Sequence, residues 1–243
     1  MSAKVALILG GSRGMGRDTA HALAAQGWRV AVASRDLAAC ERVAGDIGAS
    51  AAAFEVDVVD HASVQRCVAA VEARYGRLDA ALANAGKILG AGPLDALSPE
   101  EFAATVALNM GGVFNALSAV VPALKRAGGG ALVINAAVSG LRGAAGIGAY
   151  SAAKAGAIML AKVAAQEAGP FGVRINVIAP GFIGTDAWMA KLGPQQEALA
   201  RGVPLRRIGR GDEIAATIAW LMSDASSYVN GAVIPIDGGM TAT

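Results

Sequence analysis

Residues 5–16 read VALILGGSRGMG, five apolar residues followed by glycines at positions 10, 14 and 16. An unbroken apolar run of this length is typical of a strand buried on both faces of a parallel sheet. Glycines at the start of the following helix allow a sharp turn and leave no Cβ between the helix N-terminus and a bound phosphate. The stretch therefore predicts an α/β fold with a dinucleotide pyrophosphate at the first strand-to-helix turn.

Further apolar runs follow, separated by longer segments with a helical pattern. They lie at 29–33, 52–56, 80–83, 131–135, 174–178 and 232–236. This alternation predicts βαβ units, whose right-handed crossovers place helices on both faces of a parallel sheet. We expect a single Rossmann-type, doubly wound domain over residues 1–243, with about seven strands.

Glycines mark the expected helix ends. Gly27 follows the first helix, Gly76 the third, and residues 128–130 end a long helix that begins near Ser98. The one long irregular stretch begins at Pro180, and we expect residues 181–205 to form a substrate loop. Ligands of open α/β sheets bind outside the carboxyl ends of the strands, where this loop starts.

Composition excludes several classes of function. The net charge is only +2 and the cations are scattered, so a nucleic-acid partner is not expected. The 54% hydrophobic content is largely alanine, and we expect neither a membrane span nor a signal peptide. Cys40, Cys67, His21 and His61 lie in expected helices without ligand spacing, which predicts packing residues, no metal site and a cytoplasmic location.

Tyr150 and Lys154 form a YxxxK pair in the segment AYSAAKAG. Residues four apart share one face of a helix, so the lysine projects beside the phenol. A phenol has a pKa of about 10, and a nearby cation typically lowers it by about 1–3 units. The pair is therefore a candidate acid/base centre, although the same spacing also occurs on ordinary helix surfaces.

The glycine pattern and the YxxxK pair together resemble the short-chain dehydrogenase/reductase family, in its 3-oxoacyl-reductase-like branch. Leu9 stands where the family's TGxxxGxG motif has threonine. Three further segments are similar to family segments that contact the adenine, follow the fourth strand and grip the nicotinamide amide. They are Asp57-Val58, Asn84-Ala85-Gly86, and Pro180-Gly181 with Thr185.

The resemblance implies roles for the catalytic residues. Tyr150 would exchange a proton with the substrate oxygen during hydride transfer, and Lys154 would also bind the nicotinamide ribose. Asn109 matches the residue that holds a water in a proton relay. Ala137 occupies the position, 13 residues before Tyr150, of the family's catalytic serine.

The missing serine leaves three interpretations open. The hydroxyl was removed by design, or the substrate or Ser139 replaces it, or the protein binds a dinucleotide without catalysis. Losing one preorganised donor to an oxyanion typically lowers turnover by about 10²–10³.

The cofactor is expected to be NADP(H). The second strand ends in Ser34-Arg35, with no carboxylate for a ribose 2′-hydroxyl, and Arg13 lies in the glycine turn. Two guanidinium groups suit a 2′-phosphate, although both could simply be solvated. The full expected contact set is Gly10, Ser12, Arg13, Gly14, Met15, Gly16, Ser34, Arg35, Asp57, Val58, Asn84, Ala85, Gly86, Tyr150, Lys154, Pro180, Gly181, Ile183 and Thr185.

The substrate is expected to be a small hydrophobic ketone or secondary alcohol, covered by apolar residues of the loop. The candidates are Phe182, Trp188, Met189 and Leu192, with Ser139 beside them, although core packing would also explain the apolar ones. A carrier-bound acyl chain is less favoured, because Gly128 and Phe171 stand where a docking surface would need arginines. The remaining alternative is an NADP-sensing protein, and family analogy implies a homotetramer.

Overall fold

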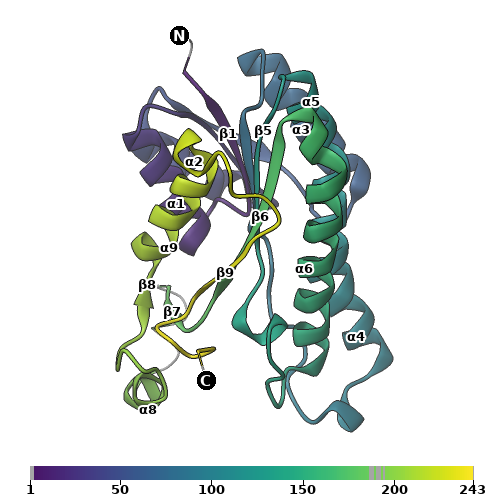
Figure 1. The fold of residues 1–243 in the computed structure, drawn as a ribbon, viewed down its shortest axis with the longest axis vertical. Helices are drawn as coiled ribbons and strands as arrows, with labels where there is room; N and C mark the ends of the chain where they lie inside the picture. The colour runs from purple at the N-terminus through teal and green to yellow at the C-terminus, as the bar shows by residue number, and fades with distance from the viewer. Residues whose placement is uncertain (1–2, 186–188, 190–192, 194, 243) are drawn as a thin grey trace.

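A computed structural model describes residues 3–185, 189, 193 and 195–242. Its main sheet has seven parallel strands in the order β3-β2-β1-β4-β5-β6-β9 (Figure 1). The expected Rossmann-type sheet is confirmed. The strands are β1 (Val5–Leu9), β2 (Arg29–Ser34), β3 (Ala51–Glu55), β4 (Ala80–Ala83), β5 (Gly130–Asn135), β6 (Val173–Pro180) and β9 (Val233–Ile236).

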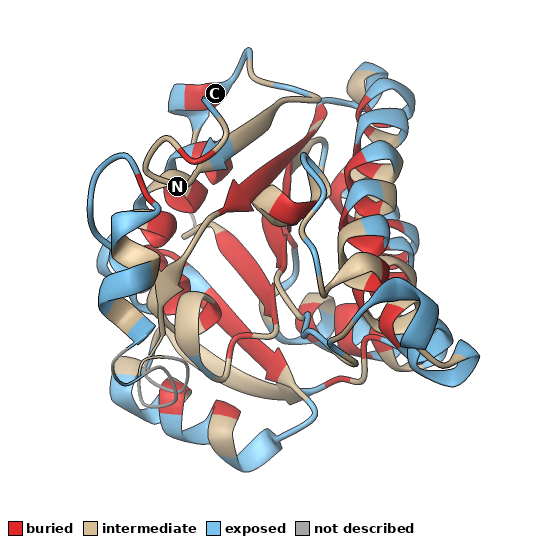
Figure 2. Cartoon of the chain, turned by 90° about the horizontal axis from the view of Figure 1, so that it is seen from below, coloured by how far each residue is buried: buried red, intermediate tan, exposed pale blue. Residues whose placement is uncertain are grey.

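Helices cover both faces of this sheet, as Figure 1 shows. One apolar cluster joins the sheet to α1 (Gly14–Ala25), α2 (Leu37–Ile47) and α9 (Gly211–Met222). The other joins it to α3 (His61–Tyr75), α5 (Gly112–Arg126) and α6 (Gly148–Ala168). Because both faces are covered, the central strands are buried (Figure 2), which explains their continuous apolar sequence.

The order of the strands reverses at β1. This strand pairs with β2 on one side and with β4 on the other, so the chain winds outward in both directions from it. The loops after β1 and β4 therefore diverge, and a crevice opens between them at the carboxyl edge of the sheet. The glycine turn of residues 10–16 lies at this edge.

The signals for the helix ends are confirmed. Ser98 caps α4 (Pro99–Val106) in a reciprocal capping box with Glu101, and Gly76 ends α3 in the left-handed conformation. Residues 128–130 have positive φ after α5. Between α4 and α5, residues Ala107–Gly111 form a π-helical turn, η2, which the sequence did not indicate.

The segment of residues 181–205 is less irregular than expected. It contains the two-residue strand β7 (Ile183–Gly184) and α8 (Gln195–Arg201), and β7 pairs in parallel with β8 (Gly209–Arg210). Such a short ladder has no periodicity in the sequence and depends on a partner far along the chain. The 3₁₀ turns are η1 (Leu94–Ala96), η3 (Val138–Gly140), η4 (Gly169–Phe171) and η5 (Asp224–Ser226).

One helical stretch in the described part of the chain, Pro99–Arg126, is long and apolar enough to cross a membrane by length and composition. Half of its most apolar window is buried within the fold. The stretch packs against α6 and the sheet, and a core helix of a globular domain meets the same two criteria. This is weak evidence for a span.

Cys40 and Cys67 are buried in α2 and α3 with free thiols, and burial raises the pKa of both. Thiols held in the protonated form behave as packing residues. Within the described residues, no three His, Cys, Asp or Glu side chains gather as metal ligands.

Candidate active site

The glycine turn after β1 has no room for side chains at its key positions. Gly10 has φ +92°, and a Cβ there would lie 2.8 Å from the backbone nitrogen of Ala85. A Cβ at Gly16 would collide with the carbonyl oxygen of Gly10. Gly14 has φ +51° and faces Thr185. These positions require glycine, and they bring the backbone of the turn against the loop after β4.

The N-terminus of α1 is open to an anion. Arg13 is its N-cap, in an extended conformation, and makes no side-chain cap. The first-turn amides of α1 therefore lack the usual side-chain acceptor, which leaves them available to a phosphate. Ser12 lies in the turn itself, and Met15 packs against the core from the first turn of α1. The turn fits the pyrophosphate of a dinucleotide.

A chain of hydrogen bonds joins this turn to the candidate catalytic lysine. The Asn84 amide donates to the Gly10 carbonyl oxygen at 2.8 Å, and the Asn135 amide donates to Asn84 Oδ1 at 2.7 Å. Lys154 Nζ donates to the Asn135 carbonyl oxygen at 2.7 Å. Three strand ends, those of β1, β4 and β5, are thus linked to α6 by polar contacts.

Asn135 was not among the residues expected from the sequence. Its signal was a polar residue ending the apolar run ALVIN, since a buried amide usually has partners that fix its place. Its Oδ1 is buried and has no hydrogen-bond partner among the described residues.

Tyr150 and Lys154 lie one turn apart on α6, with Lys154 Nζ 5.6 Å from the centre of the phenol ring. Lys154 is buried, and its burial lowers the pKa of the ammonium to about 8. Burial also raises the pKa of Tyr150 to about 12. The expected lowering of the tyrosine pKa by the lysine is therefore wrong for this structure. The ammonium donates to the Asn135 carbonyl, and desolvation of the buried phenol is what raises the tyrosine pKa.

Asn109 lies in the π turn η2 and is buried. Its Oδ1 accepts from the backbone nitrogen of Lys87 at 3.0 Å, and its Nδ2 donates to the carbonyl oxygens of Lys87 and Thr105, both at 2.9 Å. The amide oxygen and one amide hydrogen thus hold the loop after β4, and the other hydrogen bonds to the Thr105 carbonyl one turn earlier in α4. The two bonds to Lys87 explain an asparagine in mid-helix, because they give its side chain partners outside the helix.

Gly86 separates Asn109 from Lys154. A Cβ at Gly86 would lie 2.9 Å from Asn109 Oδ1 and 3.0 Å from Lys154 Nζ. The two expected catalytic residues, far apart in the sequence, therefore meet at one glycine. Ala85, beside it, donates its backbone N–H to the Leu9 carbonyl oxygen at 3.0 Å and closes the loop against β1.

Ala137 and Ser139 occupy different environments. Ala137 has extended backbone after β5 and is partly exposed. The Ser139 hydroxyl is buried and has no hydrogen-bond partner among the described residues. The η3 turn that carries Ser139 packs tightly on α6, since a Cβ at Gly140 would lie 2.9 Å from the carbonyl carbon of Lys154. In this conformation Ser139 cannot contact a bound ligand.

A pocket of about 400 Å³ lies beyond the ends of β2 and β3, lined by Arg35, Glu55, Asp57, Ser63 and Arg66. Arg35 and Asp57 were expected here, whereas Arg66 and Glu55 were not. Arg35 has no ion-pair partner within the described ranges, and Arg66 pairs loosely with Asp60 at 3.5 Å. The pocket therefore holds two cations and two carboxylates.

Three other expected cofactor residues are not among those that line this pocket. Arg13 is exposed at the start of α1 and is not among the lining residues. The Ser34 hydroxyl is 3.1 Å from the Cys40 thiol and accepts from the backbone of Asp36. Val58 is buried against α5, where its Cγ2 would lie 3.1 Å from a Cβ at Gly112.

The Pro180–Thr185 segment faces the glycine turn. Gly181 donates to the Ile236 carbonyl oxygen at 3.0 Å, and a Cβ there would lie 2.9 Å from Asp237. Ile183 belongs to β7, and the Thr185 methyl would lie 3.1 Å from a Cβ at Gly14. The structure thus brings the second expected cofactor segment against the first.

Besides Ser139, two of the expected substrate residues can be placed. Phe182 and Met189 are half-buried, and Met189 packs against Gly184 of β7. Trp188 and Leu192 lie outside the described residues.

A family model described as enoyl-(acyl-carrier-protein) reductase matches residues 10–241. The chain is also 38% identical to levodione reductase of Leifsonia aquatica, over 98% of this chain and 94% of the relative. The chain belongs to the short-chain dehydrogenase/reductase family. It is an oxidoreductase that acts on CH–OH or C=O groups with a nicotinamide cofactor.

Other relatives of this short-chain dehydrogenase/reductase span nearly its full length. It is 37% identical to a short-chain type dehydrogenase/reductase of Sinorhizobium fredii, over 99% of this chain and 98% of the relative. The crystal structure of levodione reductase superposes with a TM-score of 0.94, covering 99% of this chain and 98% of that one. A 3-ketoacyl-(acyl-carrier-protein) reductase from Brucella melitensis, complexed with NADH, matches with a TM-score of 0.92 at 28% identity, over 98% of each chain.

Proposed function

We propose that this protein interconverts a hydrophobic ketone and a secondary alcohol with NADP(H). The observation that supports this most is the continuous hydrogen-bonded path from Gly10 through Asn84 and Asn135 to Lys154, one helical turn from Tyr150. The path links the phosphate-binding turn to the acid/base pair, so these two parts of the site keep a fixed position relative to each other.

The nicotinamide cofactor supplies or accepts the hydride when bound. Tyr150 gives a proton to the substrate oxygen in reduction and takes it back in oxidation. The ammonium of Lys154 has a pKa of about 8, which is close to neutral pH. Lys154 therefore suits a relay that passes protons to the tyrosine. Asn109 holds the loop at Gly86, against which both Lys154 and Asn109 pack.

Preference for NADP(H) is supported by Arg35 in the pocket beyond β2, which Arg66 of α3 also lines. A guanidinium fork suits a 2′-phosphate. Glu55 and Asp57 in the same pocket act against this, because a carboxylate repels the phosphate and binds ribose hydroxyls. The preference is therefore smaller than two arginines alone would give.

Because residue 137 is alanine, the proposed function includes a reduced rate of turnover. Without a hydroxyl there, one donor to the developing oxyanion is missing, and turnover falls by about 10²–10³. The buried position of Ser139 supports the view that it does not replace this donor. The alternative is a dinucleotide-binding sensor, which keeps cofactor affinity and has no turnover.

A 3-oxoacyl-carrier-protein substrate is the second candidate, favoured by the name of the Brucella relative. At the docking region expected around Gly128 and Phe171, the Nζ of Lys125 lies 3.9 Å from the centre of the Phe171 ring, so this cation already faces an aromatic ring. Gly128 adds no charge. A free ketone is therefore preferred.

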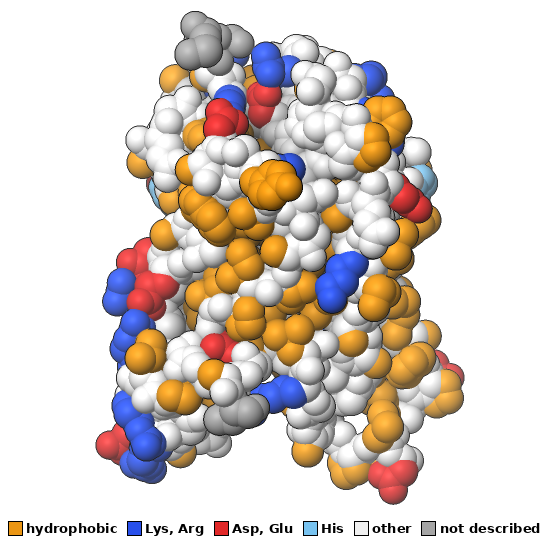
Figure 3. Space-filling view, in the orientation of Figure 1, with side chains coloured by type: hydrophobic (Ala, Val, Ile, Leu, Met, Phe, Trp, Pro, Cys, Tyr) orange, Lys and Arg blue, Asp and Glu red, His pale blue; other side chains and the backbone are white. Residues whose placement is uncertain are grey.

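A homotetramer in the cytoplasm completes the proposal. Apolar side chains gather on the face formed by β9 and α6 (Figure 3), and Met159 and Val163 of α6 are exposed. In this sheet β9 has a strand on one side only, and an open edge strand is ready to pair with a second copy. Gel filtration with light scattering measures the assembly.

The experiment that tests the activity is a rate assay at 340 nm with NADPH and with NADH. The panel holds levodione, simple alkyl and aryl ketones, secondary alcohols with NADP⁺, and a 3-oxoacyl carrier protein. Turnover of a free ketone supports the proposal, and turnover of the carrier substrate alone favours the second candidate. No turnover by this protein or its Ala137→Ser variant, with NADPH bound, favours the sensor.

A further inference from the structure

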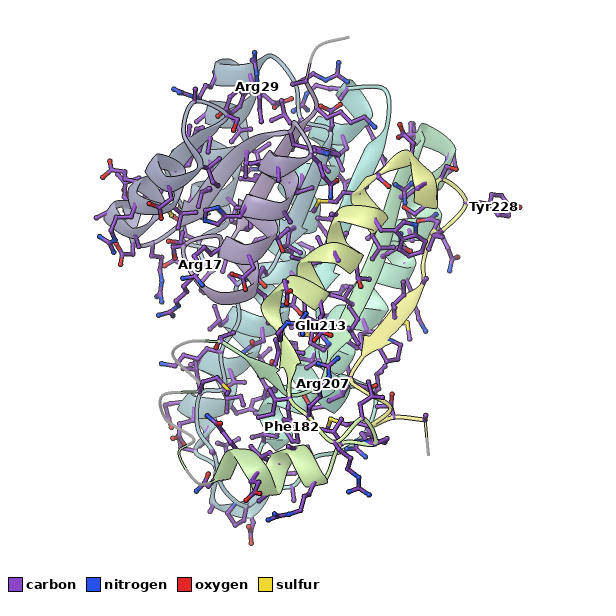
Figure 4. The ribbon with its side chains drawn as sticks, turned by 90° about the vertical axis from the view of Figure 1, so that its left-hand side faces the viewer. Arg17, Arg29, Phe182, Arg207, Glu213 and Tyr228 are labelled. Atoms are coloured by element: carbon purple, nitrogen blue, oxygen red, sulfur yellow. The ribbon has the colours of Figure 1, made fainter. Side chains whose placement is uncertain are left out.

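Glu213, in the first turn of α9, holds three donors with one carboxylate. Its oxygens accept from Arg207 Nη1 at 2.8 Å and Nη2 at 2.6 Å, a two-pronged ion pair. One of them also accepts from the backbone nitrogen of Arg210 at 2.8 Å. Figure 4 shows Glu213 at the start of α9 with Arg207 beside it and Phe182 beyond.

These contacts fix the strand β8. Arg207 precedes it and Arg210 is its last residue, so the carboxylate bonds to the chain just before the strand and at its end. A Cβ at Gly209 would lie 3.9 Å from Glu213 Oε2 and 2.8 Å from Ile183 Cδ1. Glu213 and β7 therefore lie close to the same residue of β8.

The strand β8 in turn fixes β7. Gly209 donates to the Phe182 carbonyl oxygen at 2.9 Å, and Ile183 and Gly184 pair with Gly209 and Arg210. The chain leaves β7 at Thr185, whose methyl faces Gly14 of the phosphate-binding turn. A line of direct contacts thus runs from α9 through β8 and β7 to the cofactor turn.

The ion pair is too exposed to serve the stability of the fold. The Glu213 and Arg207 side chains are 31% and 48% exposed, and ion pairs in such positions contribute little. The two-pronged geometry instead restricts where the partners can lie. The arginine and the Arg210 backbone hold the pKa of Glu213 at about 2, so the carboxylate stays ionised at neutral pH.

We propose that Glu213 is a positioning residue for the nicotinamide half of the cofactor, acting through Arg207 and β8 on the Ile183–Thr185 segment. This rests on the proposed function, which gives that segment the nicotinamide. Loss of a buried ion pair would be expected to lower both the stability of the fold and the affinity for the cofactor. Loss of this exposed pair should lower only the contribution of the nicotinamide half to cofactor binding.

The test compares a whole cofactor with its adenosine half. NADPH affinity is measured by fluorescence, and adenosine 2′,5′-bisphosphate affinity by calorimetry, for Glu213→Gln and Arg207→Gln. Each variant should bind NADPH about tenfold more weakly, a loss of about 1.4 kcal/mol. Adenosine 2′,5′-bisphosphate should bind as in the unmutated protein, because it does not reach β7.

Asp212→Asn is the matched control. Asp212 also makes a two-pronged ion pair, with Arg210 at 2.9 and 3.0 Å, one residue away on the same exposed turn. Its partner is a side chain two residues away in the sequence, so the contact spans no second strand. The variant should keep both affinities, and all three variants should have nearly the same Tm.

Other outcomes overturn the inference. Unchanged NADPH affinity in Glu213→Gln and Arg207→Gln contradicts it, as does an equal loss for the two ligands or in Asp212→Asn. If Glu213→Gln does not fold, Arg207→Gln carries the test, because it leaves the contact of Glu213 with the Arg210 backbone in place. If the unmutated protein binds NADPH no more tightly than the bisphosphate, the nicotinamide site itself is misplaced and the proposed function fails first.

Discussion

The Nζ of Lys154 lies 2.7 Å from the backbone carbonyl oxygen of Asn135, the last residue of β5. The contact ties α6 to the strand end two residues before Ala137. No carboxylate of the described residues forms an ion pair with this ammonium, and burial lowers its pKa to about 8. One hydrogen bond therefore connects the Lys154 ammonium to the strand end that carries position 137.

Stability should depend on pH through Lys154. Its pKa is about 8 when folded and about 10.4 when unfolded, so between these values the unfolded chain binds more protons. Its contribution to the free energy of unfolding then rises with pH, by about 3 kcal/mol between pH 8 and 10.4. Urea unfolding at pH 7 to 10 measures this.

The comparison protein for this measurement is Lys154→Met. Cys40 and Cys67, whose pKa values burial raises, lower stability with pH over the same range, and the difference between the two proteins removes their effect. Parallel pH profiles for Lys154→Met and the unmutated protein would contradict the lowered pKa.

Tyr150→Phe should abolish turnover and leave NADPH affinity nearly unchanged. In the proposed reaction the phenol oxygen exchanges the proton, whereas the ring, which the variant keeps, fills the same space. Lys154→Ala should damage both turnover and NADPH affinity, because the role proposed for the ammonium includes binding the nicotinamide ribose. Steady-state rates and fluorescence titration separate the two effects. Normal turnover in Tyr150→Phe would remove the tyrosine from the reaction.

Ala137→Ser should raise kcat on a suitable ketone by about 10²–10³, with little change in cofactor affinity. The position is partly exposed and extended, so an added hydroxyl meets little steric resistance. Ser139→Ala is the control, and it should leave kcat unchanged because that hydroxyl is buried. A loss of rate in Ser139→Ala, with no gain in Ala137→Ser, would make Ser139 the donor.

NADPH should bind at least tenfold more tightly than NADH, about 1.4 kcal/mol, and Arg35→Asp should reverse much of this preference. The guanidinium of Arg35 lines the pocket beyond β2, where a carboxylate would repel a 2′-phosphate. Arg42→Asp makes the same charge change on the exposed side of α2 and should leave the ratio of affinities intact. Equal affinities in the unmutated protein would contradict the assignment of NADP(H).

The strands of the main sheet could be predicted from the sequence because strands buried on both faces consist of uninterrupted apolar runs. β1 and β4 lie where the runs at 5–9 and 80–83 predict them. β6 extends to Pro180 and β3 begins at Ala51, since the ends of strands depend on pairing with neighbours. The two-residue strands β7 and β8 are too short to give such a run.

The sequence by itself determined the glycine turn, the YxxxK pair on one helix and the absence of a hydroxyl at position 137, because each depends on neighbours along the chain. Only the tertiary structure decided what surrounds them. It brought Asn109 and Lys154 together at Gly86, buried Ser139, placed Asn135 and Arg66 at the site, and connected Glu213 to it only through Arg207 and β8. It also reversed the expected pKa shift of Tyr150, because desolvation depends on burial by residues distant in the sequence.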